Sequence, residues 1–291
     1  MKSKKQHNIV TYIILIAGIL LMLVPLAVTI ISSFKPTREI TGNFFGLPEE
    51  WTLANFERLF SDGITQYFLN SAFLTVVSVA LIILVIPMAA YSIARHMERR
   101  KMFAIMYTLL ILGMFVPFQV IMLPMAKLMS DFGMTNLVGL TILYLTYAIP
   151  QTLFLYVGYI KTIVPTEMDE AAAIDGAGKF TMYRKIIFPL MKPMHATVLI
   201  INALWVWNDF LMPLLVLNKD SSTWTMPLFQ YNYQGMYFSD YGPSFASYVV
   251  GIIPILIVYL IFQKNIISGM TSGSVKLNLV QDALGIWIVC P

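Results

Sequence analysis

The chain has 291 residues, of which 58% are hydrophobic and only 12% charged, and its mean hydropathy is +0.75. Soluble domains carry about 25% charged residues, so this composition excludes an ordinary soluble protein and predicts an integral membrane protein. The net charge of +4 is spread along the chain rather than gathered in one patch, which argues against nucleic-acid binding. The single cysteine, Cys290, excludes an internal disulfide.

The first apolar run occupies residues 9–32 and follows Lys2, Lys4 and Lys5. A cleaved signal peptide has a similar charge pattern, but its apolar region has roughly 7–15 residues, whereas this run has about 24. No clear small-residue cleavage site follows the run. We therefore predict a retained transmembrane helix.

Five further apolar segments follow a polar stretch at residues 34–65, which is predicted to be an external loop. These segments cover residues 67–93, 103–129, 137–163, 187–217 and 245–262. Each is close to or above the ~20 residues needed to cross a bilayer, so the predicted fold class is an all-α integral membrane protein with six transmembrane helices. Prolines in all five segments favour bent helices around a cavity: Pro87, Pro117, Pro124, Pro150, Pro193, Pro213 and Pro254.

The distribution of basic residues predicts the orientation. An N-terminus in the cytoplasm puts every Lys and Arg inside except Lys35, Arg38, Arg58, Lys127 and Lys219. This excess of cytoplasmic positive charge satisfies the positive-inside rule. It predicts a multi-pass membrane protein with both termini in the cytoplasm, and it places the charged stretch at residues 165–193 on the cytoplasmic side.

A short cytoplasmic helix is predicted at the start of this stretch. Thr166 and Asp169 have the spacing of a capping box, and three alanines follow. Gly176 and Gly178 are expected to end the helix after two or three turns. A helix resting on lipid would carry Lys and Arg on its polar face, whereas this one carries acids, which favours docking into a basic cleft of a partner protein.

The same stretch resembles a known family. Glu170-Ala171-Ala172, Asp175-Gly176-Ala177, Ile186 and Phe188-Pro189 resemble the EAA loop of the membrane subunits of ATP-binding-cassette importers, with Phe188 at a position where Leu is usual. The resemblance extends through Asn208-Asp209-Phe210 to residues 272–276 and is greatest for the maltose-type sugar permeases. It implies the type I ABC importer permease fold in a bacterial inner or plasma membrane. It also implies that a coupling helix enters a cleft of a cytoplasmic ATPase through Glu170, Ala171, Ala172, Asp175 and Gly176.

No catalytic residue is expected in this chain. Gly178-Lys179 lacks the remaining residues of a phosphate-binding P-loop, because Ala173 and Phe180 stand where Gly and Ser or Thr are required. The three histidines are scattered, and no metal-binding motif or cofactor is predicted. Any ATP hydrolysis must come from separate chains.

Several polar residues inside the spans are candidates for the substrate path. Asp209 is the most conspicuous, because an ionisable residue at membrane depth is a functional hypothesis by default. The alternative is that it braces neighbouring helices. The full set of candidates is Asn70, Gln119, Tyr144, Gln151, Asn202, Asn208 and Asp209.

An external loop at residues 221–245 is rich in aromatic and amide side chains. Such side chains suit contact with sugar rings or with the cleft of a partner protein. In the family that the chain resembles, this loop reaches the sugar-binding protein. The predicted contact residues are Trp224, Phe229, Tyr231, Tyr233 and Tyr237; the alternative is an interfacial aromatic belt.

These observations predict the permease subunit of an ATP-driven, binding-protein-dependent oligosaccharide importer. The resemblance implies a heterodimer with a second permease subunit, two cytoplasmic ATPases and an extracytoplasmic sugar-binding protein. The expected organisation is residues 1–66 for the first helix and external loop, 67–270 for the permease core, and 271–291 for a cytoplasmic tail. Three alternatives remain: a permease of the same fold for amino acids or peptides, an ion-coupled secondary transporter and a membrane scaffold.

Overall fold

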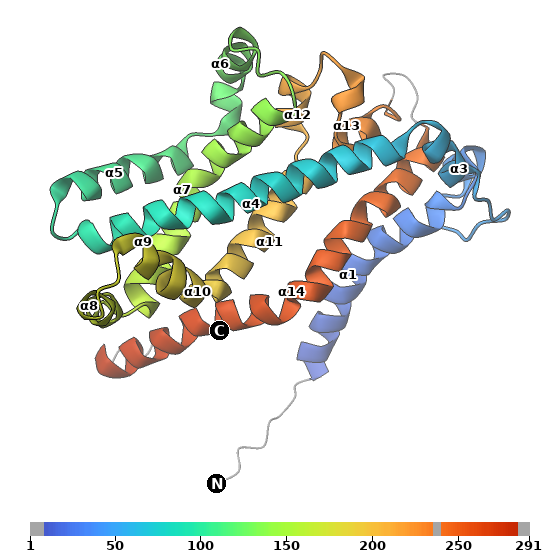
Figure 1. Cartoon of the computed structure of the whole chain (residues 1–291). Helices are drawn as coiled ribbons and strands as arrows, with labels where there is room; N and C mark the ends of the chain where they lie inside the picture. The colour runs from blue at the N-terminus through green and yellow to red at the C-terminus, as the bar shows by residue number, and fades with distance from the viewer. Residues whose placement is uncertain (1–8, 235–239, 285–291) are drawn as a thin grey trace. The chain divides into compact units, whose positions relative to one another are not determined.

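The computed structural model describes residues 9–234 and 240–284, and it is helical with no β-strand in these ranges. Its longest helices are α1 (Ile9–Ser33), α4 (Ile64–His96), α7 (Leu137–Ile163) and α14 (Tyr241–Leu284), labelled in Figure 1. Because lipid offers no hydrogen-bond partners, an apolar chain that crosses it must satisfy its backbone groups internally, which a helix does.

Four helices are long and apolar enough to cross a membrane: Thr11–Ser33, Ile64–His96, Leu137–Ile163 and Tyr241–Phe262. Two bent pairs raise the number to as many as six if each pair is one span. The first pair, Lys101–Phe115 with Phe118–Asp131, bends by 103°, and the second, Lys179–Leu190 with Lys192–Asn208, bends by 73°. The structure therefore contains the six predicted spans if each bent pair of helices is counted as one span.

The segment at residues 103–129 was expected to be one span, but it divides into α5 (Lys101–Leu112), the 3₁₀ turn η1 (Gly113–Phe115) and α6 (Phe118–Asp131). Pro117 explains the break, because a proline drives the preceding residue out of the helical region, and Val116 is extended with φ −89° and ψ 107°. Pro87, Pro150 and Pro254 lie inside continuous helices. Only some of the prolines therefore break a helix.

The segment at residues 187–217 also divides into shorter helices, in line with the bent helices predicted for it. It contains α10 (Phe188–Leu190), α11 (Lys192–Asn208) and α12 (Leu211–Val216). Asp209 is extended with ψ 130°, which ends α11. A wide π turn, η2 (Tyr183–Ile187), precedes α10, where the ring of Pro189 would clash with the carbonyl four residues before it in a regular helix.

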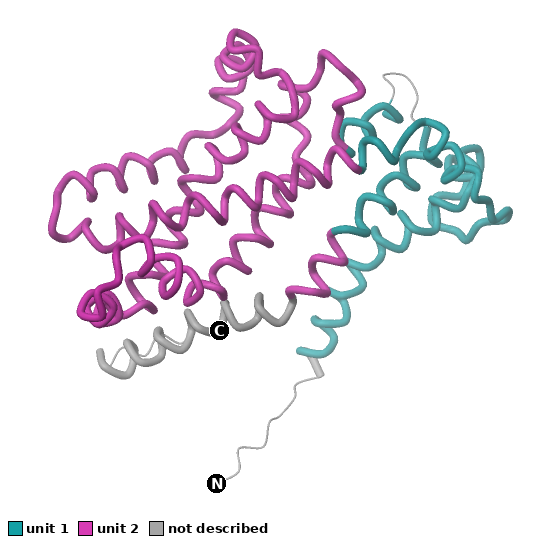
Figure 2. The backbone as a smooth tube through the Cα atoms, viewed as in Figure 1, with its two compact units in different colours: residues 1–68, 226–254 teal, residues 69–225, 255–291 magenta. Residues whose placement is uncertain are grey.

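The chain forms two compact units, coloured in Figure 2. Unit 1 comprises residues 1–68 and 226–254, and unit 2 comprises residues 69–225 and 255–291. The division after residue 68 lies next to the expected boundary at residue 66, but residues 226–254 join the first unit. The expected boundary at residue 270 falls inside α14.

Unit 1 is built around a small core to which the predicted external loops contribute. Besides α1, it contains α2 (Thr37–Gly42), α3 (Ala54–Ser61) and α13 (Met226–Tyr231). Leu59, Ile64, Met226, Phe229, Tyr233 and Ala246 form the core. The buried Asn55 amide donates to the carbonyls of Ser33 and Lys35 at 2.9 and 2.8 Å, so it satisfies carbonyl groups exposed at the end of α1.

Unit 2 holds the larger core, and it contains the charged stretch at residues 165–193. The helix α7 contacts both α5 and α11 (Figure 1). Residues of α4, α7 and α11 pack with Ala172, Met182 and Ile187 from the segment between α7 and α11. This segment is therefore part of the packed structure and not a separate loop.

We expect Asn55→Asp to destabilise unit 1 by about 2 kcal/mol, because aspartate has the same shape but cannot donate to the two carbonyls. Thermal unfolding of the purified protein in detergent checks this. The control is Asn232→Asp, at an exposed position in the same unit. Equal transition temperatures for the two variants would contradict the assigned role of Asn55.

Candidate coupling site

The predicted cytoplasmic helix is α8 (Glu167–Ile174), which has eight residues and so the expected length of about two turns. Its C-terminal end is a Schellman motif: the Ala177 N–H donates to the Ala172 carbonyl at 2.9 Å, and the Gly176 N–H donates to the Ala173 carbonyl at 3.1 Å. Gly176 has φ +78°, a conformation that glycine adopts without steric cost. The prediction that Gly176 ends the helix is confirmed.

The predicted capping box is wrong. Thr166 makes no side-chain capping bond, and Asp169 turns instead toward α4, where its Oδ2 lies 2.6 Å from the Arg95 Nε. Their side chains are only 11% and 19% exposed. Arg95 outcompetes the helix N-terminus because a charged, planar donor bonds a carboxylate more strongly than a neutral backbone N–H does.

The predicted coupling residues lie on both faces of α8. Glu170, Ala171, Asp175 and Gly176 are exposed, whereas Ala172 is 5% exposed and belongs to the unit 2 core. Ala172 therefore fixes the helix to the protein, and the others form the free surface. The small alanine at the packed position lets α8 lie close to its neighbours.

Sequence reasoning missed the apolar residues on this surface. Ile174 at the end of α8 is 87% exposed, Phe180 is 66% exposed and Met168 is 39% exposed. The available signal was their position: these are large apolar side chains within the charged stretch at residues 165–193. Exposed apolar groups of this kind mark interaction sites when they gather on one element.

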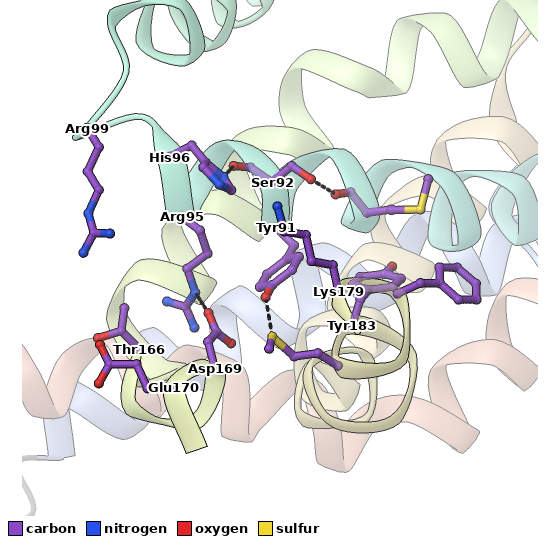
Figure 3. Close-up of a pocket in the computed structure, with 13 residues that line it drawn as sticks. Tyr91, Ser92, Arg95, His96, Arg99, Thr166, Asp169, Glu170, Lys179 and Tyr183 are labelled. Atoms are coloured by element: carbon purple, nitrogen blue, oxygen red, sulfur yellow. Dashed lines mark hydrogen bonds and ion pairs between the residues drawn. The ribbon is translucent and has the colours of Figure 1, made fainter. Parts of the chain in front are cut away.

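A pocket of about 460 Å³ lies between the C-terminal end of α4, α8 and α9 (Lys179–Met182), all within unit 2. Its charged lining includes Arg95, Arg99 and Lys179 opposite Asp169 and Glu170. Figure 3 shows Arg95 reaching from α4 to Asp169, and the Tyr91 hydroxyl directed at the Met182 sulfur, 3.1 Å away. The Arg95 guanidinium lies over the Tyr91 ring, with its central carbon Cζ 5.8 Å from the ring centroid.

Two of the substrate-path candidates meet in unit 2. The buried Tyr144 hydroxyl donates to the Asp209 Oδ2 at 2.8 Å, and its ring packs edge-on against Trp205 at 5.3 Å. The Asp209 Oδ1 accepts from the Leu211 N–H at 3.2 Å, at the start of α12. Asp209 therefore braces the break between α11 and α12.

The remaining candidates are dispersed. The Asn70 amide donates to the carbonyls of Ser222 and Trp224 at 2.8 and 2.9 Å, and so holds the segment that follows α12. Asn202 and Asn208 donate to carbonyls one turn back in α11, at 2.9 and 2.8 Å. Gln119 on α6 and Gln151 on α7 are exposed.

The aromatic residues of the predicted external loop differ in burial. Phe229 stacks on Tyr67 at 4.7 Å and is 3% exposed, and the Tyr233 hydroxyl donates to the Asp62 carboxylate at 2.8 Å. Burial, followed by this bond, raises the pKa of Tyr233, so the hydroxyl remains a donor at neutral pH. Tyr231 is 53% exposed.

The Trp224 Nε1 donates to the Leu217 carbonyl at 3.1 Å, which ties its ring to the end of α12 in unit 2. Tyr237 lies outside the described residues.

Comparison with known proteins identifies relatives along most of the chain. The profile of the family described as binding-protein-dependent transport system inner membrane component matches residues 90–272. The multiple sugar-binding transport system permease protein MsmG of Streptococcus mutans is 65% identical over 275 residues, covering 94% of this chain and 99% of that protein. The probable starch degradation products transport system permease protein AmyC of Thermoanaerobacterium thermosulfurigenes is 32% identical, with 94% and 99% covered.

A solved structure shares the fold. The chain superposes with a TM-score of 0.77 on a chain from a bacterial ABC transporter involved in the import of the acidic polysaccharide alginate. The match covers 91% of this chain and 98% of that one at 23% sequence identity. The all-α membrane fold predicted from the sequence is therefore confirmed, and the solved structure that shares this fold comes from an importer.

We expect Gly176→Ala to destabilise α8 by about 1 kcal/mol, because a side chain at φ +78° is sterically strained even though open space surrounds the position. Hydrogen exchange of the α8 amides measures the effect. Gly178→Ala is the matched control, since Gly178 also has open space but a φ of −65°. Equal exchange rates in the two variants would show that the left-handed turn does not stabilise the helix.

Proposed function

This chain belongs to the family of binding-protein-dependent transport system inner membrane components, and we propose that it is the permease subunit of an ATP-driven sugar importer. It is a multi-pass membrane protein, a transport component and not itself an enzyme. The observation that carries the coupling part of the proposal is the free surface of α8, where Ile174 is 87% exposed and is followed by the exposed Asp175.

Docking of α8 on a cytoplasmic ATPase follows from this surface. An exposed isoleucine loses unfavourable contact with water when a partner covers it, and acids around it favour a basic partner. Glu170 and Asp175 supply that charge. We propose Ile174 as the apolar anchor and Glu170 as the charged partner of an Arg or Lys on the ATPase, with Ala171 and Gly176 allowing close approach.

The assembly that we propose has two permease subunits and two ATPases. Each permease offers one docking helix, so a heterodimer with a second permease engages two ATPase copies. ATP binding draws the ATPases together and displaces the docking helices, which biases the bundle between inward-open and outward-open states. This arrangement requires α8 in the cytoplasm, and with it both chain termini.

The proposed cargo is an oligosaccharide. Relatives that are at least 30% identical over most of the chain are named for multiple sugars, starch degradation products and diacetylchitobiose, which are all carbohydrates. An extracytoplasmic sugar-binding protein would deliver the cargo, and we propose that Trp224 and Tyr231 contact it. Phe229 and Tyr233 are buried, so in this proposal they support the loop from within unit 1.

We also propose that the exposed polar side chains Gln119, Gln151 and Asn208 line the substrate path. In this role their amides would exchange bonds with sugar hydroxyls as the cargo passes. Tyr144 and Asp209, which bond each other, would keep the adjoining helices in place. Asn70 and Asn202, whose amides bond backbone or a neighbouring hydroxyl, would act in the same supporting way.

The complex purified through a tag on this chain and reconstituted in liposomes tests the cargo. We expect ATP hydrolysis to rise when the cognate binding protein and one oligosaccharide from a panel are present, because loaded binding protein favours the ATP-bound state. Stimulation by an amino acid or peptide instead would assign the chain to another cargo class. Hydrolysis indifferent to every ligand would contradict the importer proposal.

Ile174→Ala tests the anchor. We expect the amount of ATPase that co-purifies with the chain to fall about tenfold, as is typical when a central apolar interface residue is truncated. Ile142→Ala, at a 45% exposed isoleucine of α7, is the control and should leave the recovery unchanged. Undiminished recovery with Ile174→Ala would exclude this residue as an anchor.

A further inference from the structure

We propose that Arg95 is a positioning residue that transmits the displacement of α8 to α4, so that the two helices move together when the importer is driven. This inference rests on the proposed function, because it requires an ATPase that acts on α8. It assigns a role to a residue outside the cytoplasmic stretch that defines the docking surface.

Arg95 holds the start of α8 through three separate bonds. Its Nε donates to the Asp169 Oδ2 at 2.6 Å, its Nη1 to the Val164 carbonyl at 3.1 Å and its Nη2 to the Pro165 carbonyl at 3.2 Å. Val164 and Pro165 join α7 to α8, so one guanidinium contacts both the helix and the segment that leads into it. Figure 3 shows Arg95 and Asp169 pointing toward one another.

Arginine suits this role because its planar guanidinium presents several donors in a fixed arrangement. The Arg95 and Asp169 side chains are 11% and 19% exposed, so water replaces their bonds poorly and separation of the pair is costly. Sliding α8 along α4 would break all three bonds together. The geometry therefore favours movement of α8 and the C-terminal end of α4 as one body.

Apolar contacts join the same two parts of unit 2. Ala90, Ile93 and Ala94 of α4 share a core with Ala172 of α8 and Met182 of α9. Such contacts keep the elements close but resist sliding only weakly, because they are not directional. The ion pair of Arg95 adds the directional constraint that transmits a displacement.

A second ion pair at the same end of the molecule provides a matched control. The Lys161 Nζ lies 2.7 Å from the Glu98 Oε1, joining α7 to the turn after α4. Its side chains are 37% and 73% exposed, so water screens the pair and it contributes little. Removing this bond changes the charge at the cytoplasmic end without touching α8.

The test compares Arg95→Lys, Asp169→Asn and the control Lys161→Gln in the reconstituted complex. The measured quantity is sugar taken up per ATP hydrolysed. We expect this ratio to fall about tenfold in Arg95→Lys and in Asp169→Asn, within the usual range of coupling effects, while the complex assembles and still hydrolyses ATP. Lys161→Gln should match the wild type.

The outcomes separate this inference from the proposed function. A wild-type complex that shows no sugar-dependent hydrolysis would overturn the proposed function itself. A wild-type complex that transports sugar, with an unchanged ratio in both Arg95→Lys and Asp169→Asn, would overturn only the role of Arg95. Equal losses of hydrolysis and uptake would also overturn it, because a purely structural defect removes active complexes without changing the ratio. If Arg95→Lys fails to assemble, Asp169→Asn decides, since asparagine keeps the size of the side chain.

Discussion

The ion pair between Arg95 and Asp169 is the interaction on which the position of α8 in unit 2 depends. It fixes α8 against α4 and satisfies two carbonyls in the segment that enters α8. Because Asp169 and Ala172 hold the helix against its neighbours, other side chains of α8 remain free, with Glu170 and Ile174 exposed. The exposed surface that we propose for docking is thus a consequence of how α8 is held.

The membrane-spanning part shows a related use of polar side chains. Breaking a helix in lipid frees backbone groups that need partners. Between α11 and α12, the Asp209 carboxylate accepts from the Leu211 N–H and from the Tyr144 hydroxyl, so the break is satisfied within the protein. The charge that attracts attention in the sequence therefore has a structural task here, whereas the amides of Gln119 and Gln151 are exposed.

Local sequence predicts local structure well in this chain. Hydropathy located α7 at residues 137–163, and the alanines and Gly176 located α8, because these elements depend on neighbouring residues. The partner of Asp169 lies 74 residues away, and no local pattern predicts it. Local sequence also fails to predict which side chains are buried. Phe229 and Tyr231 belong to one aromatic run, yet Phe229 is buried against Tyr67 whereas Tyr231 is exposed.

Photo-crosslinking from position 174 in native membranes tests the central claim most directly, with a photoreactive amino acid in place of Ile174 and mass spectrometry of the captured partner. The account predicts a peptide from a protein that carries the G-x-x-x-x-G-K-[ST] phosphate-binding motif, because the exposed end of α8 is the docking surface. The same group at position 142 of α7 should capture no such protein. Capture of lipid alone, or of proteins without this motif, from position 174 would contradict the account.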